Sequence, residues 1–258
     1  MLQGIPVGLA FGTMPFLLKT KLSYADIGTF ALSTYPYSLK LAWSPVVDSC
    51  WVSYVTLPII GTRLGLGRRK SWIVPVQLTV GAMLWLLGDN VDRLLLNEKP
   101  PVITITALFF TLILFAATQD IAVDGWALTL LSQNNLSYAS TAQTIGLNIG
   151  YFMSFTVFLA LNSVEFSNKY LRPTAGYLEY PALSLSAYLR FASIAFILVT
   201  IWLAFFKDEN EDAANRERKE SKESLEDNLG LKGAYEVMWK ICKLKRKFTA
   251  AVAIERPS

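Results

Sequence analysis

The sequence predicts an all-α integral membrane protein with six transmembrane helices, and three observations carry this prediction. Charged residues make up only 17% of the 258 residues, against about 25% in a typical soluble domain. Residues 1–206 hold just 21 of the 44 charged side chains (24 Lys and Arg plus 20 Asp and Glu). Six apolar segments divide this low-charge part, each close to the roughly 20 residues that cross a bilayer, without the alternating pattern of membrane-barrel strands.

The first two apolar segments, residues 2–18 and 27–47, are rich in residues that disturb helices. The first contains three glycines and two prolines and is at the short limit for a span. Because it begins directly at Met1 with no hydrophilic lead, we expect a truncated first helix. The second segment contains Pro36 and Pro45, each of which lacks the backbone N–H that a continuous helix needs.

The other four segments are more regular, and each predicts one helix. They cover residues 71–88, 102–131, 141–161 and 183–206. The segment at 102–131 is long enough to cross the bilayer with tilt or to project beyond it. We therefore expect residues 1–206 to form a six-helix transmembrane bundle.

The chain changes character at residue 207. Residues 207–230 are a polar run of mixed charge, which predicts a solvated cytoplasmic linker. Residues 231–247 have apolar side chains on one helical face with lysines around it, a pattern typical of a helix that lies on a membrane surface. Residues 231–258 are thus expected to form a basic amphipathic helix and tail.

Basic residues predict how the six helices are oriented. The loops fall into two sets, and the set that includes the 48–70 loop and the C-terminal tail holds 16 basic residues against 7 in the other. Cytoplasmic loops carry the excess of Lys and Arg. Both termini are therefore predicted to be cytoplasmic.

Composition excludes several classes of function. The chain has no histidine, so it can form neither a Ser-His-Asp triad nor a histidine zinc site. We predict that the protein is not an enzyme and has no catalytic residue, metal ion or cofactor. Cys50 and Cys242 lie far apart and indicate no disulfide framework. The net charge of +4 forms no basic stripe interleaved with aromatic residues, so no nucleic-acid partner is expected.

Lys40 is a charged residue inside a predicted span. On insertion scales such a residue costs about 2.5–3.5 kcal/mol at the helix centre, so its presence needs a reason. It follows Pro36 by one turn, where the helix is already weakened. Lys40 either faces a water-filled path that an anionic solute can use, or it snorkels or pairs internally without contacting a solute.

Asp120 and Asp124 are four residues apart and therefore share one helix face, with Gln119 on an adjoining face. Two such carboxylates can bind a proton, pair with a basic group or order water. No nucleophile or metal-ligand set accompanies them, which disfavours acid–base catalysis. Their predicted depth is that of the basic residues 68–70, so we favour an ion pair or a gate over direct contact with a solute.

Glycines in the first and fifth segments allow two interpretations. Irregular backbone at membrane depth, as expected in residues 2–18, is typical of helices that line a transport path. The alternative is close helix packing through small residues, which Gly146 and Gly150 favour by their spacing of four. Asn148 lies between them and faces either a neighbouring helix or the path.

Five stretches of the chain resemble one protein family. They are residues 2–9, 38–48, 67–72, 116–128 and 168–172, of which 116–128 is the most specific. Together they resemble the acetyl-coenzyme A transporters of the major facilitator superfamily over about residues 2–244. Bacterial muropeptide permeases share a shorter version of the 116–128 stretch.

The resemblance implies a twelve-helix transporter that carries acetyl-CoA from the cytosol into the endoplasmic reticulum. This chain then corresponds to the N-terminal half, a truncated half-transporter with an insertion at residues 52–66. The acid Asp48 and the basic residues Arg68 and Arg69 resemble the signature that locks the cytoplasmic face of the superfamily, although a plain positive-inside loop would also explain the basic residues.

The candidate site residues fall into two sets. The residues expected to bind substrate are Lys40, Gln119, Asn148 and Arg190. The residues expected to act in gating or proton coupling are Asp48, Arg68, Arg69, Asp120 and Asp124.

The implied partners are acetyl-CoA, the lipid bilayer and a second copy or a full-length homologue, because a lone half lacks the second wall of the path. Two other functions stay open. One is proton-coupled transport of a muropeptide-like or sugar-like solute, and the other is a non-transporting fragment that binds a full-length partner.

Overall fold

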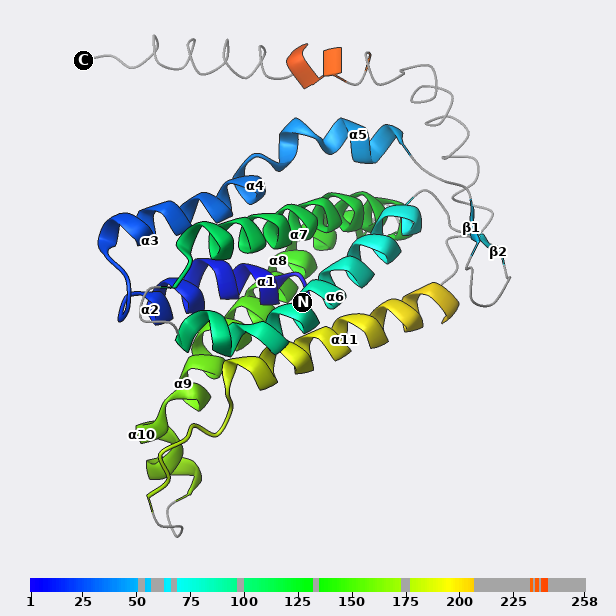
Figure 1. Cartoon of the computed structure of the whole chain (residues 1–258). Helices are drawn as coiled ribbons and strands as arrows, with labels where there is room; N and C mark the ends of the chain where they lie inside the picture. Colours follow the sequence, from blue (N-terminus) through cyan, green and yellow to red (C-terminus); the bar gives the residue numbers. More distant parts are fainter. Residues whose placement is uncertain are drawn as a thin grey trace, which may run out of the picture.

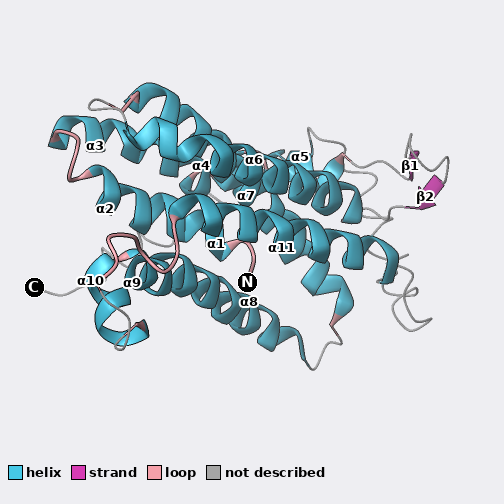
Figure 2. Ribbon diagram, turned by 60° about the horizontal axis from the view of Figure 1, so that its bottom comes forward, coloured by secondary structure: helices cyan, strands magenta, loops and turns pink. Residues whose placement is uncertain are grey.

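The computed structural model describes residues 1–50, 54–56, 63–65, 69–96, 100–131, 135–172, 177–206, 233, 235–236 and 238–240. In these residues the regular structure is a bundle of helices plus one short β-ribbon (Figures 1 and 2). The helix α7 (Val102–Leu130) lies at the centre and contacts helical pieces from the first, second, third and fifth apolar segments. It therefore positions the polar residues of the 116–128 stretch inside the bundle.

The first apolar segment forms a rod of three consecutive pieces. These are α1 (Gly4–Gly8), the π-helical turn η1 (Leu9–Thr13) and α2 (Met14–Leu18). The rod is shorter than the helices that meet the length expected of a membrane span. The glycine and proline content of this segment thus coincides with an irregular helix.

The second apolar segment is divided into five short pieces. They are α3 (Tyr24–Ala31), η2 (Leu32–Thr34), α4 (Tyr35–Ser38), η3 (Lys40–Ala42) and α5 (Ser44–Ser49). Pro36 and Pro45 lie in the first turns of α4 and α5, where a proline needs no N–H partner and the preceding helix ends. Ser23 and Asp26 start α3 with a capping box.

The remaining four segments form the long helices of the bundle. They are α6 (Lys70–Leu96), α7, α8 (Leu136–Phe152) continued by η5 (Met153–Val157) and α9 (Phe158–Asn162), and α11 (Leu185–Phe206). Four helices in the described residues are long and apolar enough to cross a membrane, and they coincide with the last four predicted segments. The prediction of an integral membrane protein is thereby supported, while the count of six spans stays a prediction.

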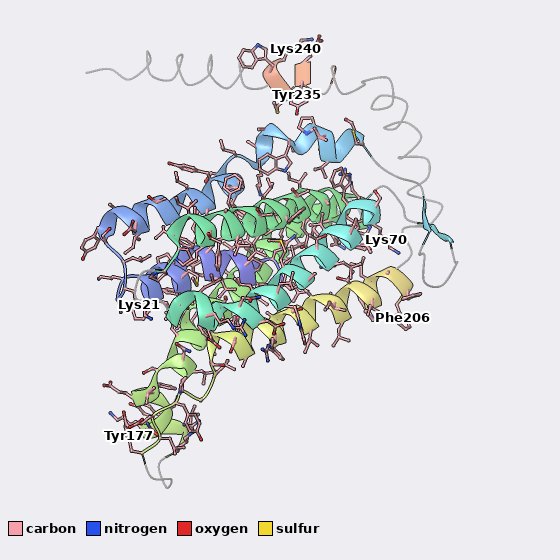
Figure 3. The ribbon with its side chains drawn as sticks, in the orientation of Figure 1. Lys21, Lys70, Tyr177, Phe206, Tyr235 and Lys240 are labelled. Carbon is pink, nitrogen blue, oxygen red and sulfur yellow. The ribbon has the colours of Figure 1, made fainter. Side chains whose placement is uncertain are left out.

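Two parts of the chain lie outside the bundle. The helical turns α10 (Val164–Phe166) and η6 (Ser167–Leu171) continue beyond α9, and Tyr177 lies at the far end of this projection in Figure 3. At residues 54–56 and 63–65 the antiparallel strands β1 (Tyr54–Thr56) and β2 (Arg63–Gly65) pair, with Tyr54 opposite Gly65. This ribbon departs from the all-helical expectation and falls within the predicted insertion.

The predicted C-terminal regions lie largely outside the described residues. The linker 207–230 is entirely outside them, and of the amphipathic helix only a few helical residues between 233 and 240 are described. The Tyr235 hydroxyl donates to the Ala42 carbonyl at 2.9 Å, so this segment contacts the second apolar segment at η3. The domain boundaries stay predictions.

The core packs α6 tightly against α11. The Ser193 hydroxyl donates to the Gly81 carbonyl at 2.7 Å, and the Thr200 hydroxyl donates to Gln77 Oε1 at 3.1 Å. Buried aromatic and aliphatic side chains fill the spaces between helices, for example Phe30 edge-on to Phe109 at 5.4 Å between ring centres. The face of α7 that carries Asp120 is turned toward the second segment and α8.

Small residues bring α1 and α8 into backbone contact. A Cβ added to Gly150 would lie 2.9 Å from Gly4 Cα, and one added to Gly8 would lie 2.8 Å from Ser154 Cβ. Two hydrogen bonds join the same two segments where η5 continues α8: the Thr13 hydroxyl of η1 donates to the Ser154 carbonyl at 2.7 Å, and the Ser154 hydroxyl donates to the Ile5 carbonyl of α1 at 2.9 Å. The interpretation of these glycines as close-packing residues is confirmed.

Candidate functional site

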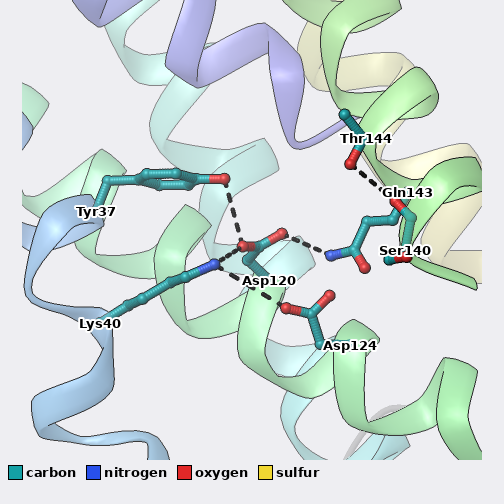
Figure 4. Close-up of polar contacts among 7 residues, drawn as sticks. All are labelled: Tyr37, Lys40, Asp120, Asp124, Ser140, Gln143 and Thr144. Carbon is teal, nitrogen blue, oxygen red and sulfur yellow. Dashed lines mark hydrogen bonds and ion pairs between the residues drawn. The ribbon is translucent and has the colours of Figure 1, made fainter. Parts of the chain in front are cut away.

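Asp120, near the middle of α7, is the centre of a polar cluster (Figure 4). Its side chain is only 4% exposed and accepts hydrogen bonds from three elements of the bundle. The Lys40 ammonium lies 2.5 Å and the Tyr37 hydroxyl 3.3 Å from Oδ2, and Gln143 Nε2 lies 3.1 Å from Oδ1. Both carboxylate oxygens therefore have partners.

Lys40 reaches Asp120 because of the break in the second segment. The helix α4 ends at Ser38, and the tight turn η3 starts with Lys40, whose side chain extends toward α7. Its ammonium also lies 4.0 Å from Asp124 and 5.2 Å from the centre of the Tyr37 ring. The side chain is 29% exposed, so Lys40 is paired and yet still reaches open space.

That open space is a cavity of about 360 Å³ between the second segment, α7 and α8. Its volume lies at the lower end of the roughly 300–1,000 Å³ range of small-molecule sites. The helix α7 contributes the acids, and α8 contributes an uncharged polar wall. The polar lining residues are Tyr37, Lys40, Asp120, Asp124, Ser140, Gln143 and Thr144.

The structure does not bring the other three predicted substrate residues into this cavity. Gln119 is 2% exposed, with no partner for Oε1 among the described residues, and it does not line the cavity. Asn148 is exposed and donates to the Thr144 carbonyl at 2.9 Å. Arg190 pairs with Asp89 at 2.8 Å, which ties α11 to α6.

Sequence reasoning missed Tyr37 and Gln143. Tyr37 precedes Lys40 by three residues, and this spacing places both on one face of a helix. Gln143 is a polar residue inside an apolar segment, which is itself a signal for a functional position. Neither signal identifies Asp120 as their common partner.

A second polar contact lies at the ends of α5 and α6. Arg69 forms an ion pair with Asp48, and its guanidinium also lies directly against Gly125 of α7, where an added Cβ would overlap it. Trp72 Nε1 donates to the Cys50 carbonyl at 2.5 Å beside this pair. The described residues thus bring Asp48 and Arg69 together, whereas Arg68 lies outside them.

Replacing Gly125 with alanine is expected to displace Arg69 and to loosen its pairing with Asp48. The reason is steric, because the new methyl group would occupy the position of the guanidinium. The neighbouring Cys50 thiol should then be alkylated faster, measured in a chain with Cys242 replaced by serine. Asp48→Asn should accelerate the reaction in the same way. An unchanged alkylation rate in both variants would contradict the linkage.

Spanning-length apolar helices and an ion pair inside a cavity define the chain as a polytopic helical membrane protein with a polar interior site. Residues 1–251 match the protein family described as acetyl-coenzyme A transporter 1. The chain therefore belongs to this transporter family, as the sequence motifs predicted.

The relatives include proteins of fungi and bacteria. An uncharacterized membrane protein of Saccharomyces cerevisiae is 49% identical over 221 residues, which cover 79% of this chain and 37% of the relative. An uncharacterized protein of Schizosaccharomyces pombe is 39% identical over 216 residues, covering 83% of this chain and 39% of the relative. A candidate transporter of Rickettsia prowazekii, AmpG 3, is 31% identical over 156 residues, covering 58% and 33%.

This chain thus spans little more than a third of the length of the fungal relatives that it matches. No solved structure matches it.

Proposed function

We propose that this chain supplies the solute-binding half of a membrane transporter for acetyl-CoA. The observation that carries the proposal is the Lys40–Asp120 pair on the wall of a cavity beside α7, a helix long and apolar enough to cross a membrane. Charged groups inside a membrane are costly and characteristically face a path for ions or solutes. The membership of the chain in the acetyl-coenzyme A transporter family supports the choice of substrate.

Lys40 is the proposed contact for an anionic group of the substrate. It is the cation that lines the cavity among the described residues, and the phosphates of CoA are anionic. Acetyl-CoA is larger than the cavity, so only one end of the molecule would lie there. The remaining contacts are proposed to come from a second wall, supplied by a second copy or by a longer homologue.

The proposed direction is from the cytosol into the lumen of the endoplasmic reticulum, with both termini of this chain in the cytosol. The excess of basic residues in one set of loops supports this orientation. Labelling of single cysteines from either side of sealed microsomes tests it, because a modification at residue 258 that requires membrane permeabilisation would contradict the orientation.

Proton-coupled transport of a muropeptide-like or sugar-like solute is the second candidate. Two carboxylates on the cavity wall favour it. The similarity to the transporter AmpG 3 of Rickettsia prowazekii supports transport but names no solute. A non-transporting protein that binds a full-length partner is the third. Co-purification of a tagged copy with the longer homologue, in the absence of ligand binding, would favour that function.

A competition experiment on the purified chain in nanodiscs separates these candidates. Radiolabelled acetyl-CoA should bind saturably, and unlabelled CoA should compete while an anhydromuropeptide should not. The double variant Lys40→Met/Asp120→Asn removes both charges together and should bind at least about tenfold more weakly, since buried charge contacts contribute several kcal/mol. Lys169→Met, outside the cavity, is the matched control. Absence of saturable acetyl-CoA binding would contradict the proposal.

A further inference from the structure

We propose that the two acids of α7 have different roles: Asp120 is a permanent counter-ion of Lys40, and Asp124 binds a proton that must be present before an anionic solute can bind. This inference rests on the proposed transport of an anion. The two acids look alike in the sequence, but Asp120 would have a structural role and Asp124 would bind and release a proton.

The contacts of Asp120 support the structural role. Its side chain is 4% exposed, and Lys40, Tyr37 and Gln143 donate to it from η3, α4 and α8. A buried carboxylate with these donors holds three elements together, and losing its charge would remove the close partner of Lys40. Any step that neutralised Asp120 would therefore disturb the whole wall of the cavity.

Asp124 differs from Asp120 in its exposure and in its distance from Lys40. Its side chain is 42% exposed, it lines the cavity, and the Lys40 ammonium is 4.0 Å away, beyond hydrogen-bond distance. A proton can reach this carboxylate through the cavity and can leave again without breaking a short contact. Asp124 is thus the acid whose charge can change while the cluster keeps its geometry.

The charge of the cluster links that proton to the solute. With both acids ionised, the single charge of Lys40 leaves the cluster at −1, which repels an anion. A proton on Asp124 brings the cluster to zero, and Lys40 can then attract an anionic group. Proton binding and anion binding therefore favour each other.

The other ionisable groups around Asp124 do not change this balance. The Tyr37 hydroxyl faces Asp120 from α4, and the residues of α8 that line the cavity carry no charge. On the α6 side, Arg69 lies against Gly125 but is paired with Asp48. The amino group of Met1 lies beside Gly146 of α8 and interacts with Asp120. A charge on this group would add equally to both states of Asp124, so a proton on Asp124 would still make the cluster more favourable to an anion by one unit of charge.

Infrared difference spectra of the purified chain between two pH values test the assignment without any solute. The wild type should gain a carboxylic-acid C=O band at the lower pH, Asp124→Asn should lose that band, and Asp120→Asn should keep it. If Asp120→Asn does not fold, the double variant Lys40→Met/Asp120→Asn replaces it. A band that persists in Asp124→Asn, or no band in the wild type, would overturn the inference.

Binding of acetyl-CoA gives the second measurement. Affinity should fall about tenfold per pH unit above the midpoint at which Asp124 loses its proton, because one proton accompanies each anion. Asp124→Asn should bind with an affinity that no longer depends on pH. A wild type that shows the infrared band but binds no acetyl-CoA would contradict the proposed function while leaving the assignment of the carboxyl group intact.

Discussion

Replacement of Lys40 with methionine is expected to destabilise the folded chain by about 3 kcal/mol, near the lower end of the range for broken buried ion pairs. The loss arises at Asp120, which is buried and would keep its charge without its closest partner. Tyr37 and Gln143 would still donate to it, but neither carries a charge. The partial exposure of Lys40 explains why the lower end of the range applies.

Unfolding of the purified chain in mixed micelles measures this effect. The double variant Lys40→Met/Asp120→Asn should regain most of the lost stability, because no buried charge is then left without its partner. The charge of Asp124 remains, but its side chain is 42% exposed. Lys169→Met, on the projection beyond the bundle, should be close to neutral and serves as the control. Equal stability of Lys40→Met and the wild type would show that Asp120 needs no ion pair with Lys40 for the chain to stay folded.

Replacement of Gly150 with alanine is expected to separate α1 from α8, at a cost of about 3 kcal/mol, the upper end of the range for overpacking. The added methyl group would overlap the Met1 carbonyl and lie 2.9 Å from Gly4 Cα. Both neighbours are backbone, so no side chain can move aside. The whole first segment would have to shift.

A matched control exists in the same chain. Gly28, in α3, has no atom within 4 Å of an added Cβ, so Gly28→Ala should be neutral or stabilise the helix by about 0.5–1 kcal/mol. Disulfide cross-linking between cysteines at positions 5 and 154 should decrease in Gly150→Ala and stay unchanged in Gly28→Ala. Unchanged cross-linking in both variants would show that α8 adapts to the larger residue.

Much of the fold follows from the sequence, because apolar length and proline position are local properties. The long helices coincide with predicted apolar segments, and Pro36 and Pro45 coincide with the breaks of the second segment. The cost of a charge in a membrane also singled out Lys40 and the two acids of α7, which the structure places together.

Whether the remaining residues contribute to the site depends on which helices pack side by side. The composition of the chain does not determine that packing. Arg190 was expected near an anionic substrate, yet it pairs with Asp89 across α6 and α11. Gln143 contributes to the cluster only because α8 packs beside α7. The basic residues 68–70 were expected at the depth of the α7 acids, and Arg69 indeed lies against Gly125, although its ion pair is with Asp48.

The contact between the first apolar segment and the helix formed by α8 and η5 has a consequence for biosynthesis. Thr13 and its acceptor Ser154 are separated by 141 residues, so the docking surface for the first segment is made long after that segment leaves the ribosome. At 5–20 residues per second, the delay is roughly 7–28 s. During this time the short, glycine-rich first segment lies beside the insertion machinery without the helix against which it packs. In ribosome-bound chains, the first segment should therefore stay loosely packed until α8 and η5 have been synthesised.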